Sequence, residues 1–160
     1  IRIFDKVPFK NVYYLNGHAT DLEEECTRYT SLLSQFPTDI VCLGIGENGH
    51  IAFNDPDVAN FNDHKLVKIV KLDHVCRQQQ VNEKCFETLE QVPTEALTLT
   101  IPALLKAKWM FCIVPFKNKS QAVYRTIHGD ISEKCPASIL RRKEKSSLYL
   151  DTESAQLLNL

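Results

Sequence analysis

The sequence predicts an α/β fold, a three-layer α/β/α sandwich built on a mainly parallel, Rossmann-like sheet. Short apolar runs that are typical of strands alternate with helical patterns along the whole chain. One such run, 40–43, leads directly into a glycine-rich loop, and loops at the carboxyl ends of parallel strands are where open α/β sheets bind ligands. A length of 160 residues, of which 44% are hydrophobic and 24% charged, suits a single domain over residues 1–160.

The part of the chain before the glycine-rich loop is expected to supply a strand, a helix and a second strand. The first strand is expected at 12–15. Thr20 would be the N-cap of the helix, with Glu23 completing a capping box. The glutamates at 23–25 suit a solvated first turn, where negative charge favours the helix dipole. The run 40–43 would then form a buried strand.

The rest of the chain continues the alternation of strands and helices. The expected strands are 65–72, 97–101, 108–114 and 147–150. The expected helical segments are 73–83, 103–107, 119–128, a turn opened by Pro136, and 152–158. Gly129 would occupy the C-cap position of the helix that precedes it.

The glycine-rich loop carries the residues that are best suited to chemistry. Gly44, Gly46 and Gly49 allow positive φ angles and a close approach of a ligand to the backbone. His50 follows at once and Asp55 soon after, and an imidazole beside a carboxylate can act as a general acid/base pair. Taken singly, these residues fit a tight turn and an ordinary polar histidine equally well.

The glycine spacing also matches GxGxxG, which is found in dinucleotide-binding loops. That site would need an acidic residue about 20 residues on, at the end of a second strand. Asp63 lies near this spacing but before the next apolar run, so the sequence disfavours a dinucleotide site.

As a whole, the string from Gly44 to Pro56, GIGENGHIAFNDP, resembles the signature of glucosamine-6-phosphate deaminases, also called isomerases. The wider superfamily also contains 6-phosphogluconolactonases. Further matching segments are Asn11–Gly17, Cys76–Gln78, Ala96–Thr98 and Pro136–Leu140. The resemblance implies that the chain is the C-terminal part of such a domain. The family's first βαβ unit, with a phosphate loop and the aspartate that moves the substrate C2 proton, would lie outside it.

The resemblance implies an enzyme that opens the ring of an amino sugar phosphate, isomerises aldose to ketose and releases ammonia and fructose 6-phosphate. His50 would exchange protons at ring opening, and Asp55 would orient it and stabilise its charged form. Asn48 could hold a hydrogen bond to His50 but could not stabilise the imidazolium by charge. The sequence departs from the family here, because Asn48 replaces an aspartate and Asp55 a glutamate. Family glycines are also replaced, by Thr100 and Pro102 in one turn and by Phe116 in the phosphate loop. These changes bear on whether turnover is retained.

The expected substrate-binding residues are those of the loop and two cations. Arginine suits an oxyanion through bidentate hydrogen bonding, and a lysine in the first turn of a helix adds charge to free backbone N–H groups. Lys117 is a rival for this role, but the resemblance favours Lys119. The set is Gly44, Gly46, Gly49, Arg77 and Lys119.

Two other functions remain open. The segment 97–103 looks more like a 6-phosphogluconolactonase, a hydrolase, although Ala96 stands where lactonases carry an arginine. A non-catalytic module that binds sugar phosphates would keep Lys119 and Arg77 while its acid/base residues changed.

Composition excludes several classes of partner. A formal charge of −1 gives no reason to expect nucleic acid or an anionic membrane. The six cysteines form no CxxC pair, which favours reduced thiols in a cytoplasmic protein. We expect no cofactor, and no metal, since His50 has no second histidine or cysteine near it in sequence at ligand spacing. A homo-oligomer is compatible with the resemblance.

Overall fold

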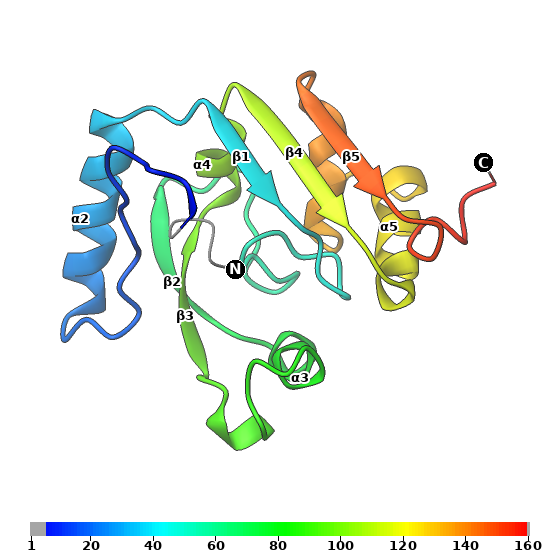
Figure 1. Ribbon diagram of the computed structural model, residues 1–160, viewed down its shortest axis with the longest axis horizontal. Coiled ribbons are helices and arrows are strands. Elements are labelled where there is room, and N and C mark those ends of the chain that lie inside the picture. The colour runs from blue at the N-terminus through cyan, green and yellow to red at the C-terminus, as the bar shows by residue number, and fades with distance from the viewer. Residues whose placement is uncertain (1–5, 160) are drawn as a thin grey trace.

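The computed structural model describes residues 6–159 and contains two sheets (Figure 1). The larger sheet has the order β1-β4-β5, formed by Ile40–Leu43, Trp109–Val114 and Ser146–Leu150, and its neighbouring strands are parallel. The smaller sheet pairs β2, Val67–Lys71, with β3, Glu95–Leu99, in antiparallel register. The α/β class and the parallel sheet are confirmed.

The helices connect these strands in the alternation that the sequence predicts. The α-helices are α2 (Leu22–Gln35), α3 (His74–Asn82), α4 (Ile101–Leu105) and α5 (Ser120–His128). Short 3₁₀ helices cover Leu89–Gln91, Lys117–Lys119 and Pro136–Arg142. Within residues 6–159, no helix is long and apolar enough to cross a membrane.

The core lies between one face of the larger sheet and the helices α4, α5 and Pro136–Arg142. Alternate residues of β4 point into it, so Met110, Cys112 and Val114 are at most 1% exposed. In Figure 1 these helices lie behind the sheet, and α2 packs beside the β2–β3 pair.

The opposite face of the larger sheet is apolar but exposed. Ile40, Trp109, Ile113 and Tyr149 lie on this face at 41–55% exposure. The strand register pairs Ile40 with Trp109 and Ile113 with Tyr149. Within residues 6–159, helices therefore cover only one face of this sheet, and the second helical layer of the predicted sandwich is not seen. Exposed apolar patches of this kind mark interaction surfaces or cause association.

Replacing Ile40 and Tyr149 with lysine is expected to reduce self-association of the purified chain, measured by light scattering. Both side chains already contact water, so the free energy of unfolding should change by less than about 1 kcal/mol. Met110→Lys is the matched control, because Met110 is 0% exposed on the core face and a buried charge should unfold the chain. Unchanged association in the double variant would contradict a role for this face.

Two predictions for the N-terminal region were wrong. Residues 12–15 form no strand. The N-cap of α2 is Asp21, not Thr20, and its carboxylate accepts the N–H groups of Glu23 and Glu24 at 2.9 and 3.0 Å.

The glutamates of the first turn of α2 are not all solvated, because Glu25 is buried. Its carboxylate pairs with Arg28 at 2.6 Å and accepts the N–H of Asn16 at 2.7 Å. These two partners, Arg28 first, lower the pKa of Glu25 to about 2. Near the C-terminus, residues 152–158 form successive turns instead of the expected helix.

Candidate functional site

The loop that follows β1 lines a cavity of about 710 Å³ at the carboxyl end of the parallel sheet. Three segments that are far apart in sequence contribute to its wall: this loop, the C-terminal part of α3, and the turn after β4. Its polar and aromatic lining residues are His50, Gln79, Asn82, Glu83, Phe116, Asn118 and Lys119, and Gly44 and Gly46 also face it. The fold thus gathers a histidine and a lysine in one cavity.

His50 is held from several directions and is only 8% exposed. Its backbone N–H donates to Oδ1 of Asn48, and its backbone carbonyl accepts the N–H of Gly46, both at 2.9 Å. A methyl group at Gly46 would overlap the imidazole, so this position requires glycine for close approach. The ring is therefore positioned by the loop itself.

Asp55 lies beside this ring and is 1% exposed. Its Oδ1 is 2.8 Å from Nδ1 of His50 and accepts a hydrogen bond from Nδ2 of Asn48 at 2.9 Å. Burial raises the pKa of Asp55, but the contacts with His50 and Asn48 outweigh it and hold that pKa below its usual value. The carboxylate is thus ionised at neutral pH.

The side chain of Asn48 donates hydrogen bonds to two carboxylates. Its Nδ2 donates to Asp55 and also, at 3.0 Å, to Oδ2 of Asp73, the N-cap residue of α3. An aspartate here could donate neither bond and would add a third negative charge. The asparagine that departs from the family pattern therefore suits the carboxylates around it.

Asn48→Asp is consequently expected to destabilise the chain at neutral pH by about 2 kcal/mol, measured by urea unfolding. Repulsion from Asp55 and Asp73 would raise the pKa of the new carboxyl group, so acidification toward about pH 5 should protonate it and shrink the deficit. Asn48→Ala, which loses the two Nδ2 bonds and also the bond from the His50 backbone N–H without adding charge, is the control and should regain less. A variant as stable as the parent at neutral pH would contradict this geometry.

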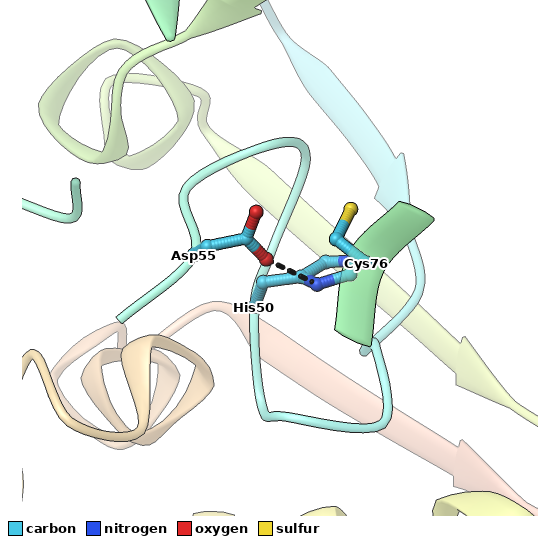
Figure 2. A group of neighbouring side chains, drawn as sticks. All are labelled: His50, Asp55 and Cys76. Atoms are coloured by element: carbon cyan, nitrogen blue, oxygen red, sulfur yellow. Dashed lines mark ion pairs between the residues drawn. The ribbon is translucent and has the colours of Figure 1, made fainter. Parts of the chain in front are cut away.

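Cys76 approaches the histidine from helix α3, and sequence reasoning missed it as a site residue (Figure 2). Potential ligand atoms of His50, Asp55 and Cys76 all lie within 4.8 Å of one another. Cys76 is 0% exposed, and burial, together with the charges of Asp55 and Asp73, raises the pKa of its thiol to about 12. Its backbone N–H donates to Asp73 at 2.6 Å, which fixes the first turn of α3 against the loop.

Lys119 lies in the turn after β4, in the wall of the same cavity, and is only 6% exposed. Its Nζ lies 3.2 Å from Oε1 of Glu83, and the same oxygen accepts a hydrogen bond from Gln79 at 2.8 Å. Phe116 stands at the cavity with φ 81° and ψ 146°, a backbone region that side chains rarely adopt, and is 63% exposed.

Two of the predicted binding residues lie elsewhere. The guanidinium of Arg77 donates to the carbonyl groups of Leu89 and Val92 at 2.7 and 2.9 Å, and Arg77 does not line the cavity. These bonds hold the segment after α3, and a contact of Arg77 with phosphate stays a prediction. Gly49, with φ +93°, supports the loop from behind, where its carbonyl accepts the N–H of Ala137 at 2.9 Å.

Comparison with known proteins gives consistent matches. The family model described as glucosamine-6-phosphate isomerases/6-phosphogluconolactonase matches residues 2–149. The glucosamine-6-phosphate deaminase of Bacillus cereus (strain B4264) is 43% identical over 156 residues, and that of Bacillus cytotoxicus is 42% identical. Each alignment covers 98% of this chain and 58% of the relative, so the chain spans less than two thirds of the relatives' length.

Solved structures match over a similar share. A monomeric glucosamine-6-phosphate deaminase superposes with a TM-score of 0.84 and 38% identity, over 91% of this chain and 58% of the other. A 6-phosphogluconolactonase from Trypanosoma cruzi, at 18% identity, has a TM-score of 0.63 over 86% of this chain and 52% of the other, which is evidence for the shared fold alone.

Proposed function

Because the chain belongs to the glucosamine-6-phosphate isomerase/6-phosphogluconolactonase family, we propose that it is the sugar-phosphate-binding and ring-opening part of a glucosamine-6-phosphate deaminase. The complete reaction would isomerise the opened aldose to a ketose and release ammonia and fructose 6-phosphate. The observation that carries the proposal is that His50, held in place beside an ionised Asp55, lines the same cavity as the buried Lys119. The six unpaired cysteines support a cytoplasmic location.

Ring opening needs one group that can both accept and donate a proton. The imidazole of His50 would take the proton of the anomeric hydroxyl group and return one to the ring oxygen, so its own protonation state is restored. The nearby carboxylate of Asp55 would stabilise the transient imidazolium and keep the ring in place. The hydrogen bonds from Asn48 and Gly46 make this arrangement rigid before substrate arrives.

Phosphate binding is assigned to Lys119. A dianionic phosphate group would compete with Glu83 for the ammonium group, and Gln79 and Asn118 line the same part of the cavity with amide donors. We assign only ring opening and phosphate binding to residues 6–159.

Glu83→Gln is expected to strengthen binding of inorganic phosphate about threefold, because it removes the carboxylate that pairs with Lys119. Glu83 is partly exposed, which limits the effect to the range of surface ion pairs. Isothermal titration would measure the dissociation constant, and Glu87→Gln, an exposed glutamate outside the cavity lining, is the control. Weaker phosphate binding in Glu83→Gln would contradict this arrangement.

The proposed activity is tested by incubating glucosamine 6-phosphate with the purified chain, and with a fusion to the part of the Bacillus cereus relative that the chain does not match. Equal amounts of ammonia and fructose 6-phosphate would support the proposal. Hydrolysis of 6-phosphogluconolactone without ammonia release would replace it by the lactonase function. Binding of glucosamine 6-phosphate without any turnover, in both proteins, would indicate a non-catalytic module.

A further inference from the structure

The imidazole of His50 lies beside two further side chains that could bind a metal ion. Figure 2 shows His50 and Asp55 on the loop after β1 and Cys76 on helix α3, with their polar ends converging. The three residues are 8%, 1% and 0% exposed, and one ligand atom from each lies within 4.8 Å of the others. A nitrogen, an oxygen and a sulfur donor are thus buried together.

Two of these polar groups are incompletely satisfied. Nδ1 of His50 lies 2.8 Å from Oδ1 of Asp55, but no hydrogen bond of acceptable direction joins them. Oδ2 of Asp55 is buried and makes no hydrogen bond of acceptable geometry, although the backbone N–H of Asp73 and the thiol of Cys76 lie close enough to the carboxyl group to shift the pKa values at this cluster. Buried polar atoms without partners are costly and call for a ligand or a functional reason. General acid/base chemistry explains the Nδ1–Oδ1 contact, but it does not explain Oδ2 or the nearby thiol.

We propose that His50, Asp55 and Cys76 form a binding site for a divalent metal ion of the zinc type. Imidazole nitrogen, thiolate sulfur and carboxylate oxygen are the ligands that Zn²⁺ prefers, whereas Mg²⁺ and Ca²⁺ select oxygen alone. Binding would release the thiol proton of Cys76 to solvent, and no oxidation or reduction is involved. Three protein ligands leave a fourth position for water.

The surroundings suit a bound cation. Asp73 adds negative charge, and Asn48, through its bonds to Asp55 and Asp73, would fix the carboxylate ligand from outside. His50 lines the cavity, so an ion can reach the cluster from that side. Since the ion would hold the atoms of the proposed acid/base pair, it would inhibit ring opening; this consequence, unlike the binding itself, rests on the proposed function.

Cobalt is the probe for the metal site, because a thiolate ligand gives Co²⁺ an intense charge-transfer absorption. The experiment uses a parent in which the exposed Cys42 and Cys85 are replaced by serine, which removes adventitious thiol binding. We expect one Co²⁺ per chain and displacement by Zn²⁺. Cys76→Ser should lose the absorption and weaken binding at least about tenfold, the smallest effect of altering even an outer-shell partner. Cys112→Ser, a buried cysteine outside the cluster, should retain both.

No charge-transfer absorption in the parent, or its persistence in Cys76→Ser, would overturn the proposal. Circular dichroism verifies folding, and if Cys76→Ser does not fold, His50→Gln provides a second ligand variant that should also bind at least about tenfold more weakly. Unchanged affinity in His50→Gln overturns the site. The inhibition of ring opening is measured, for the parent and for Cys76→Ser, as the ratio of the reaction rates with and without Zn²⁺. Absent turnover with an intact cobalt absorption would reject the deaminase function and still support the metal site.

Discussion

His50→Gln is expected to lower kcat for deamination of glucosamine 6-phosphate about 10³-fold in the fusion protein, within the range of general acid/base contributions. Glutamine is similar in size and can hydrogen-bond, but it cannot accept and return a proton at neutral pH. KM should change little, because the proposed phosphate contact is made by Lys119 in another part of the cavity. The measurement is steady-state kinetics with ammonia and fructose 6-phosphate both quantified.

A second histidine provides the control for this experiment. His128 lies exposed on α5 next to Tyr124, outside the cavity, so His128→Gln should keep the parental rate. Asp55→Asn should have an effect in the same direction, because it removes the charge that stabilises imidazolium. A parental kcat in His50→Gln would contradict the role that we assign to this residue.

Gly46→Ala is expected to reduce kcat about 10²-fold or more, although the substitution adds only a methyl group. The new Cβ would overlap the ring of His50, so the imidazole must shift from its present position beside Asp55. Displacement of a reacting group by about 1 Å can cost this much in rate. Thermal unfolding measured in parallel separates the loss of rate from any loss of folded protein.

Gly44→Ala is the matched control, since it adds the same methyl group in the same loop. Its Cβ would lie 3.4 Å from the carbonyl oxygen of Ile113, a tight but acceptable contact, and the imidazole would not be displaced. We therefore expect at most a few-fold change in rate. Equal losses in the two variants would mean that the loop, and not the position of His50, limits the reaction.

Local sequence patterns predicted a helix or strand where neighbouring residues decide the structure, and they failed where distant residues decide it. The run 40–43 forms the strand β1 as expected, because its apolar residues are bounded sharply and pair with the apolar residues of β4. The prediction that this strand is buried was wrong, because its residues are exposed or half-buried on the sheet. Residues 12–15 have the composition of a strand, but in the described part of the chain, 6–159, this segment is not a strand. Thr20 and Asp21 are both good N-caps, and only the folded backbone selects the aspartate.

The composition of the site was harder to predict where it depends on the rotation of a helix. In α3, Cys76 and Gln79 are spaced to lie on one face, and that face is buried toward the glycine-rich loop. Arg77, one position further round the helix, points to Leu89 and Val92 instead. The sequence pattern of this polar helix does not mark which face meets the loop, so Arg77 was expected at the binding site and the place of Cys76 beside His50 was not predicted.

The most direct test of the proposed role of residues 6–159 is the exchange rate between the α and β anomers of glucosamine 6-phosphate, followed by NMR with the chain alone. Anomer exchange requires ring opening and closing but neither isomerisation nor ammonia release. We predict acceleration by the parent chain and by His128→Gln, and none by His50→Gln. Phosphate binding without any acceleration of anomer exchange in the parent would contradict the assignment of ring opening to this site.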